Sequence, residues 1–298
     1  MNCSLFPAKV TFYNLIRFAI TLVLTGFLWF LATAKTSAGQ SCSENAEDQF
    51  RLGRSYYWGE GVNQSFEQAG IWYRKAAEQG NLKAMYNLGV MFLQGQGTVK
   101  NEVEGFKWIR QAAEGGDPRA SYVYGVLLCE GKGVVKNARE GHSWLTKASE
   151  MGSVNAEARI GKDYLYGGDG FTAEPTKALP LIEKASESGN PWACGRLGEI
   201  LEKGKLLPKD LEKSRSLFQK GAELGDPASQ FEYARLLMMS DPVKAYPWIK
   251  LAEEGHDTRA IGLMTECRPG LTPDQVASGD AVAEKIRKNY QQFPSPGK

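Results

Sequence analysis

The sequence predicts an all-α fold, namely an α-solenoid that winds as a right-handed superhelix of about six helix–turn–helix units and ends in a C-terminal capping helix. The first observation is a repeat: the segment that starts at Ala84 returns at Ala120, 36 residues later. The second is that apolar residues within each copy follow helical spacing, and the third is that glycines recur at fixed points. A period of this length is typical of stacked supersecondary units rather than of a globular enzyme core.

The first helix of each unit carries one apolar stripe. In the second unit, Ala84, Leu88 and Phe92 recur at i, i+4 and i+8, which is one face of a helix. Gly89 lies beside this stripe, where the absence of a side chain allows the second helix to approach closely. Each unit has this key glycine, or a small substitute, at the same place. The set is Gly53, Gly89, Gly125, Gly161, Gly198 and Ala234.

The turn and the second helix have their own signals. A Gly-x-Gly pair such as Gly95 and Gly97 ends the first helix and supplies left-handed backbone positions. Asn101 and Glu104 then form a capping box, with a short polar side chain at N-cap and a glutamate at N3. A tryptophan recurs within the second helix, and a glycine closes each unit. The tryptophans are Trp72, Trp108, Trp144 and Trp248, and the closing glycines are Gly80, Gly116, Gly152, Gly189, Gly225 and Gly255.

These signals divide the chain into consecutive segments. The predicted segments are a signal peptide or N-terminal membrane anchor over 1–38, a linker over 39–44, the repeat array over 45–266, a capping helix over 267–291 and a disordered tail over 292–298. The predicted units are 45–80, 81–116, 117–152, 153–189, 190–225, 226–255 and a partial unit 256–266. The capping helix has its own start signal, because Thr272, Pro273 and Gln275 suit the N-cap, N1 and N3 positions.

The N-terminal segment determines the expected location. Phe18 to Ala34 is a run of 17 residues without charge that follows Lys9 and Arg17. Small residues come next, which favours a cleavage site near Ala34 or Ala38, whereas an uncleaved run of this length is at the lower limit of a membrane span. In either case the positive charges on the amino side place the array outside the cytoplasm. We expect a periplasmic or secreted protein, or one anchored in the membrane by this segment alone.

Taken together, the repeated residues form the pattern A-x-x-x-L-G-x-x-(Y/F)…G-x-G…N-x-x-E…W-x-x-(K/Q)-A-A-x-x-G. This pattern resembles the Sel1-like repeat family, a relative of the tetratricopeptide repeats, and the resemblance covers roughly residues 45–255. The resemblance implies an adaptor that binds other proteins, often in cell-envelope assembly, signalling or host interaction. It implies no particular partner.

No constellation for catalysis, cofactor binding or metal binding emerges from the sequence. The two histidines, His142 and His256, fall in different units and lack neighbours at ligand spacing, and no nucleophile has a base beside it. The glycine pairs lack the Gly-Lys-Ser/Thr continuation of a phosphate loop. We therefore expect neither an enzyme nor a cofactor.

Cysteine spacing and net charge exclude two further features. Cys129, Cys194 and Cys267 fall in different parts of the array, where stacked units lie about 10 Å apart. A disulfide needs Cα atoms within about 7 Å, so we expect none within the array. Removal of residues 1–38 deletes three cations and no acid, which changes the formal net charge from +2 to −1. A nearly neutral array offers no electrostatic footprint for nucleic acid.

A candidate binding surface lies on the first helices of the first three units. By analogy with tetratricopeptide arrays, positions −6, −3, +1 and +4 from the key glycine are expected to face the concave surface. These positions carry aromatic and aliphatic side chains flanked by cations, which suit an acidic partner. The candidate residues are Phe50, Arg54, Tyr57, Lys83, Tyr86, Val90, Leu93, Arg119, Tyr122 and Val126. Aromatic anchors beside arginine are common in interface hot spots; the alternative is that these side chains pack against adjacent helices.

The sequence therefore predicts an exported, non-enzymatic scaffold that binds a protein or peptide through its concave face. The alternative is a binder or modulator of cell-wall glycan, or of the enzymes that remodel it, with the aromatic residues acting as a platform for sugar rings. A hydrolase would need a nucleophile beside a base, which the sequence does not offer.

Overall fold

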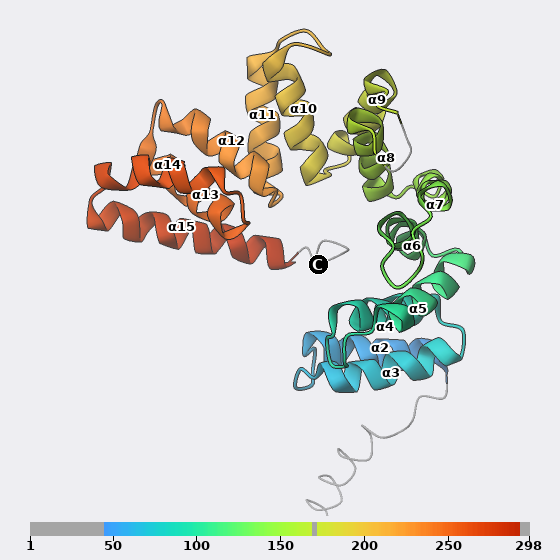
Figure 1. Ribbon diagram of the computed structural model, residues 1–298. Coiled ribbons are helices and arrows are strands. Elements are labelled where there is room, and N and C mark those ends of the chain that lie inside the picture. Colours follow the sequence, from blue (N-terminus) through green and yellow to red (C-terminus); the bar gives the residue numbers. More distant parts are fainter. Residues whose placement is uncertain (1–44, 169–171, 293–298) are drawn as a thin grey trace, which may run out of the picture.

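The computed structural model describes residues 45–168 and 172–292 of the chain. These residues form fourteen α-helices and one short 3-10 helix, without a β-strand among them, which confirms the predicted all-α fold. Figure 1 shows the helices following one another along an open arch, with α2 near one end and α15 at the other. Consecutive helices pack against each other along the arch, so the architecture is an α-solenoid.

Six units each contribute a first and a second helix. The first helices are α2 (Ala46–Trp58), α4 (Leu82–Gln94), α6 (Pro118–Glu130), α8 (Val154–Tyr166), α10 (Pro191–Lys203) and α12 (Pro227–Met238). The second helices are α3 (Phe66–Glu78), α5 (Glu102–Glu114), α7 (Ala138–Glu150), α9 (Pro175–Glu187), α11 (Leu211–Glu223) and α13 (Pro242–Glu254). The array is followed by α14 (Arg259–Cys267), a 3-10 turn (Arg268–Gly270) and α15 (Pro273–Gln292).

Most helices begin at a side chain that accepts a hydrogen bond from the first turn. The predicted cap Asn101 accepts from the backbone N–H of Glu104 at 3.1 Å, and Asn137 does the same for Glu140 at 3.2 Å. Each such bond satisfies one of the N–H groups that a helix start leaves without an intrahelical acceptor. The helix starts are therefore specified locally, unit by unit.

Replacing Asn101 by alanine is expected to lower the free energy of unfolding by about 1 kcal/mol, because α5 then loses its N-cap acceptor. Urea denaturation followed by circular dichroism measures this change. Val103, which is 52% exposed on the same first turn, provides the matched control, and Val103→Ala is expected to be nearly neutral. Equal effects from both variants would show that the cap does not contribute.

The core of each unit forms where the key glycine meets the second helix. A Cβ built on Gly89 would lie 2.7 Å from Cγ1 of Ile109, closer than real Cβ contacts, so the glycine allows the two helices to touch, as predicted. The residue that fills this contact directly follows the tryptophan position. In the six units it is Tyr73, Ile109, Leu145, Ile182, Phe218 and Ile249, each at most 1% exposed. The tryptophans themselves are only partly buried.

The Gly-x-Gly loops of the second and third units lie directly against the unit before them. Gly97 and Gly133 both have positive φ, at 64° and 71°, as predicted for these turns. A Cβ on Gly97 would overlap the backbone of Phe66 at the start of α3, and one on Gly133 would overlap the carbonyl oxygen of Glu102 at the start of α5. The second glycine of the pair is thus required for close approach as well as for backbone conformation.

The C-terminal helix starts later than predicted. The prediction placed it over 267–291, but Cys267 still belongs to α14, and a 3-10 turn precedes α15. The reason is the capping box itself, since the N–H of Gln275 donates to Oγ1 of Thr272 at 3.3 Å and the N–H of Thr272 donates to Oε1 of Gln275 at 2.9 Å. The box was predicted correctly, and it places the helix start at Pro273.

The sixth unit closes one residue later than predicted. His256, not Gly255, takes the left-handed position, with φ of 66°. The N–H of Asp257 donates to Ala252 O at 2.9 Å, which matches the bond from Asp117 to Ala112 O at the end of the second unit. By this hydrogen-bond pattern, His256 occupies the left-handed position that a glycine such as Gly116 occupies in earlier units.

The predicted signal or anchor segment (1–38), the linker (39–44) and the tail residues 293–298 lie outside the described residues, while Gln292 ends α15. In the described part of the chain, every helix is too short or too polar to span a membrane.

Candidate interaction surface

Side-chain bridges join first helices of successive units, and one more joins the last first helix, α12, to α14. Arg159 of α8 lies 3.6 Å from Glu130 of α6, Arg235 of α12 lies 2.6 Å from Glu202 of α10, and Arg259 of α14 lies 2.7 Å from Glu232 of α12. In Figure 1 the first helices α4, α6 and α8 lie nearer the inside of the arch than the second helices α5, α7 and α9. We therefore take the inner ends of these first helices as the concave surface of the arch in Figure 1.

Helical geometry shows which positions of a first helix can face this surface. Residues advance by about 100° around a helix, so position +4 returns to within about 40° of the key glycine, which faces its own second helix. Positions +1 and −6 lie about 100° to 120° away from the glycine. The predicted inward positions +1 and −6 are thus compatible with the concave surface, whereas +4 is not.

The structure corrects the prediction at the two +4 residues. Leu93 packs onto α5, where a Cβ on Gly105 would lie 2.7 Å from its Cγ atom. Tyr57 packs edge-on against Phe66 at the start of α3, with ring centroids 5.1 Å apart, and its hydroxyl donates to Oε1 of Gln96 at 2.8 Å. Both side chains are half-buried because they fill the contact between the two helices of their unit.

Two −3 residues are also buried. Phe50 is 8% and Tyr86 is 6% exposed, and burial raises the pKa of the Tyr86 hydroxyl. A cation from the next unit covers each ring: Lys83 Nζ lies 6.0 Å from the Phe50 centroid, and Arg119 Cζ lies 4.5 Å from the Tyr86 centroid. These rings are therefore not accessible anchors. Tyr122, the third −3 residue, is half-buried against the cluster around Leu145 and Ile160.

The remaining predicted residues form the accessible part of the site. Arg54, Lys83 and Arg119 are exposed, while Val90 and Val126 are half-buried. Two residues that the prediction missed extend this set: Trp58 at position +5, which is 48% exposed, and Val123 at position −2, which is half-buried. The same 100° rule applied to the sequence could have found both. We name this surface the concave patch; it comprises Arg54, Trp58, Lys83, Val90, Arg119, Val123 and Val126.

Charge differs between the two halves of the concave surface. Toward the C-terminus each bridging arginine contacts two carboxylates: Arg235 contacts Glu202 and Glu232, and Arg259 contacts Glu232 and Asp257. In the concave patch, by contrast, Lys83 makes its described contact with an aromatic ring and forms no ion pair among the described residues. Of the other two cations of the patch, Arg119 pairs with Asp117 at 3.0 Å and Arg54 lies 3.8 Å from Glu60, so each of them has one carboxylate partner.

A separate candidate site is a hollow between α9 and the loop that leads into α11. It has a volume of about 720 Å³, and Leu201 and Leu207 contribute to its lining. Leu206 occupies the loop position that Gly97 and Gly133 hold in other units, and it does not adopt a positive φ. A side chain there is incompatible with the close docking that those glycines allow, which explains why this loop leaves a hollow.

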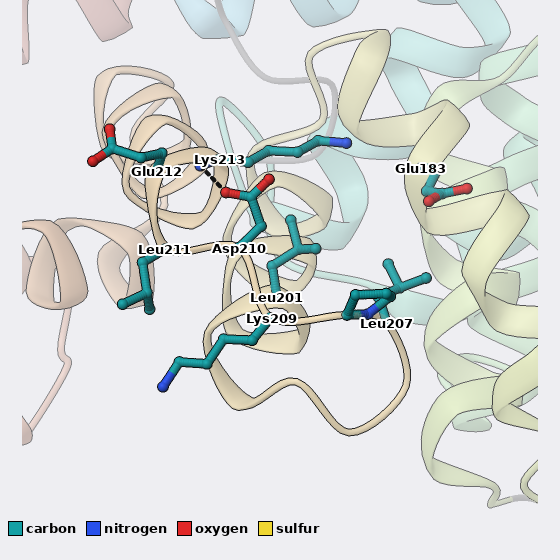
Figure 2. A pocket seen from close by; sticks show the side chains of 9 residues that line it. Glu183, Leu201, Leu207, Lys209, Asp210, Leu211, Glu212 and Lys213 are labelled. Atoms are coloured by element: carbon teal, nitrogen blue, oxygen red, sulfur yellow. Dashed lines mark hydrogen bonds between the residues drawn. The ribbon is translucent and has the colours of Figure 1, made fainter.

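This hollow is a weaker candidate than the concave patch. Figure 2 shows Glu183 on α9 facing the loop across the hollow, and Asp210 accepting the backbone N–H of Lys213 at 2.9 Å. The lining carries three carboxylates, from Glu183, Asp210 and Glu212, against two lysines, Lys209 and Lys213. These mixed charges select no class of ligand.

The titratable residues outside these surfaces play packing roles. His142 lies edge-on against Tyr164, with centroids 5.9 Å apart, and burial lowers its pKa. Cys129, Cys194 and Cys267 are buried thiols, and burial raises the pKa of the latter two. Within the described residues, the His, Cys, Asp and Glu side chains include no group of three placed to hold a metal ion.

Several solved structures have a fold similar to that of this chain. A Sel1 repeat protein from Oxalobacter formigenes is 31% identical over 71% of this chain and 89% of that chain, with a TM-score of 0.65. The c5321 protein, a protective antigen of uropathogenic Escherichia coli strains with an SLR fold, is 27% identical over 84% of this chain and 58% of that chain, with a TM-score of 0.59. The immunity protein Pa5087 of Pseudomonas aeruginosa shares the fold at 20% identity and a TM-score of 0.50, over 85% of this chain and 84% of that chain. No functionally curated protein matches the sequence.

The family model of the Sel1 repeat matches five consecutive segments of the chain. The matched residues are 46–81, 82–117, 118–153, 154–190 and 193–226. Each of the first four matches contains one first helix and one second helix of the structure, and the fifth contains α11 and all of α10 except its first two residues. Sel1 repeat proteins generally mediate protein–protein interactions, and their solenoid is typically a non-enzymatic scaffold. The chain belongs to the Sel1 repeat family.

Proposed function

We propose that this protein is an exported, non-enzymatic scaffold that binds a protein or peptide through the concave patch on α2, α4 and α6. The observation that carries the proposal is the combination of half-buried valines with the exposed ring of Trp58 and three cations on one surface. Apolar side chains that are only partly covered within a fold gain further burial from a partner. An aromatic ring and arginines beside them supply the residue types found at interface hot spots.

Export is the second part of the proposal. It is supported by the sequence of residues 1–38, in which Lys9 and Arg17 precede an uncharged run. A signal peptide or an anchor with this charge distribution directs the following array out of the cytoplasm. The protein would then meet its partner in the periplasm, at the membrane surface or outside the cell.

The glycan alternative has less support than a protein partner. It requires aromatic rings with open faces on the concave surface, but Phe50 and Tyr86 are buried and covered by cations. Trp58 is the exposed ring that remains in the concave patch. The concave patch therefore offers one exposed aromatic ring for stacking against a sugar, whereas the sequence predicted several.

The test is photo-crosslinking from a probe residue placed at Val90, in cells that produce the full chain. Val90 is half-buried on the concave patch, and a probe at Lys107 on α5 provides the matched control, because its side chain is 60% exposed on a second helix. We expect a discrete protein adduct from position 90 and none from position 107. Mass spectrometry of the adduct then identifies the partner.

Two outcomes would contradict the proposal. Equal crosslinking from both positions would show that the concave patch is not selective. Adducts to glycan in place of protein at position 90, revealed by loss of the adduct after muramidase digestion, would favour the alternative function.

A further inference from the structure

We infer that residues 293–298, which have the sequence Phe-Pro-Ser-Pro-Gly-Lys and lie outside the described residues, dock on the concave surface of the fourth and fifth units. The surface that receives them is named the aromatic site; it comprises Tyr166, Trp192 and Arg196. The inference goes beyond the proposed function, because it concerns another part of the concave surface and an occupant that belongs to the same chain.

The two rings of the aromatic site hold positions that face the concave surface in the first units. Tyr166 ends α8 at position +5 from its key glycine, which is the position of Trp58 in the concave patch. Trp192 of α10 lies at position −6, which is the position of Lys83 in the concave patch. The aromatic site is therefore the counterpart of the concave patch in later units.

One guanidinium connects the two rings. Cζ of Arg196 lies 5.6 Å from the centroid of the Tyr166 ring and 5.7 Å from that of the Trp192 ring, which orders all three groups through cation–π attraction. Nη1 of Arg196 also donates to Oε2 of Glu199 at 2.7 Å, and Glu199 lies 3.4 Å from Lys203. Because these charges pair with one another, the rings are the groups that remain to recognise a ligand. The ring of Tyr166 is accessible, since this residue is 54% exposed.

An uncharged segment with proline rings suits such a surface. Proline-rich segments adopt the extended polyproline II conformation at a low cost in entropy and dock in grooves lined by aromatic side chains. Residues 293–298 include Pro294 and Pro296 directly after Phe293, and their first charged side chain is that of Lys298. The segment thus brings three apolar rings, whose burial against Tyr166 and the half-buried Trp192 is favourable.

Contacts of Tyr290 fix the end of α15, from which this segment continues. The Tyr290 hydroxyl donates to the carbonyl oxygen of Ala222 at 2.7 Å and accepts from Nε2 of Gln230 at 3.1 Å. Its ring also lies beside Gly225, 3.5 Å from the place of a Cβ on that glycine. These contacts hold the last turns of α15 at the junction between α11 and α12, and Figure 1 shows this end of α15 directed toward the inside of the arch.

The same junction leads to the aromatic site through one further contact. Asp226 belongs to the junction, and its Oδ2 lies 2.9 Å from the place of a Cβ on Gly195 of α10, which is one helical turn from Trp192. With ordinary backbone dimensions the path from Tyr290 to Trp192 through these contacts measures about 25 Å at most, and the direct separation is shorter. Six residues in the polyproline II conformation span about 19 Å, so the length of the segment matches this separation.

The test places a photo-crosslinking residue, benzoylphenylalanine, at position 293 of the full chain and locates the crosslinks by mass spectrometry of proteolytic peptides. We expect crosslinks within one chain to the peptides that contain Tyr166 or Trp192. Tyr166→Ala is expected to lower their yield about tenfold. The matched control is Trp58→Ala, which removes the ring at the equivalent position of the first unit and is expected to leave the yield unchanged.

A second measurement tests the docking with a separate peptide. Replacing Phe293, Pro294 and Pro296 together by glycine is expected to leave the aromatic site open. A labelled peptide with the sequence Phe-Pro-Ser-Pro-Gly-Lys should then bind this variant about tenfold more tightly than the unchanged chain, in which the tethered segment competes. Fluorescence anisotropy measures both affinities.

Several results would overturn the inference. Crosslinked products of twice the mass of the chain would assign the segment to a second copy, and crosslinks confined to α13 and α15 would show that the segment stays at the C-terminal end of the array. Equal losses of yield from Tyr166→Ala and Trp58→Ala, or equal affinity of the peptide for both chains, would also contradict docking at the aromatic site. Crosslinking from position 90 tests the proposed function separately, so either can fail without the other.

Discussion

Replacing Phe218 by alanine is expected to lower the free energy of unfolding by about 4 kcal/mol, the largest single loss that we expect for a side-chain truncation in this chain. The Phe218 side chain is 0% exposed, and a Cβ on Gly198 would lie 2.9 Å from its Cε1 atom. The ring thus fills the contact between α10 and α11, and its removal leaves a cavity that the surrounding backbone cannot close. Urea denaturation of the full chain measures the loss.

The control for this prediction is Leu211→Ala on the same helix. Leu211 is 57% exposed, so its truncation is expected to change stability by no more than about 0.5 kcal/mol. Because a solenoid is stabilised by nearest neighbours, amide hydrogen exchange in the Phe218→Ala variant should increase most in α10 to α12. Uniform loss of protection across the array would contradict this local model.

Replacing Gly133 by alanine is expected to lower the free energy of unfolding by about 3 kcal/mol. The φ of Gly133 is 71°, a conformation that costs an L-residue about 1 to 2 kcal/mol. The new Cβ would also overlap the Glu102 carbonyl oxygen at the start of α5, and relief of that overlap would move the loop off the preceding unit. Thermal and urea denaturation together measure the effect.

Gly116→Ala separates the two causes. Gly116 also has a positive φ, of 92°, but a Cβ built there meets nothing within 4 Å. Its substitution should therefore report backbone strain alone, with a loss of about 1 to 2 kcal/mol. If Gly133→Ala and Gly116→Ala lower the free energy of unfolding equally, the close approach of the loop to α5 makes no measurable contribution to stability.

Local features of the fold were predictable because they depend on residues close together in the chain. The caps at Asn101 and Thr272 use acceptors and donors three residues apart, and the glycines at 97 and 133 specify left-handed turns by lacking a side chain. Each of these signals acts within one turn of backbone. A single sequence therefore shows them without knowledge of packing.

Packing between helices was harder to predict. The tryptophans recur at one position of the second helix, but the fully buried position is the next residue, exemplified by Ile109 beside Trp108. The two positions differ by about 100° around the helix. Which of them faces the first helix depends on how that helix is rotated, and residue size alone does not reveal the rotation.

The accessibility of the candidate site residues was also hard to predict, because it depends on packing between helices. The prediction counted Phe50 and Tyr86 as accessible because their positions lie toward the concave side, but the following unit covers them with Lys83 and Arg119. Leu93 was placed inward, but it fills the contact with α5. In each case the burial of one residue depends on a side chain more than ten positions away.

The sequence by itself determined the family, the helical units, their caps and their turns, because each of these is encoded in a short segment and repeated along the chain. The tertiary structure alone decided which side chains remain accessible on the concave surface and which carboxylates lie beside its cations, as Asp117 does beside Arg119. Those properties depend on how far each unit is rotated and shifted against its neighbour. That rotation results from the packing of many side chains together, of which Ile109 against Gly89 is one example.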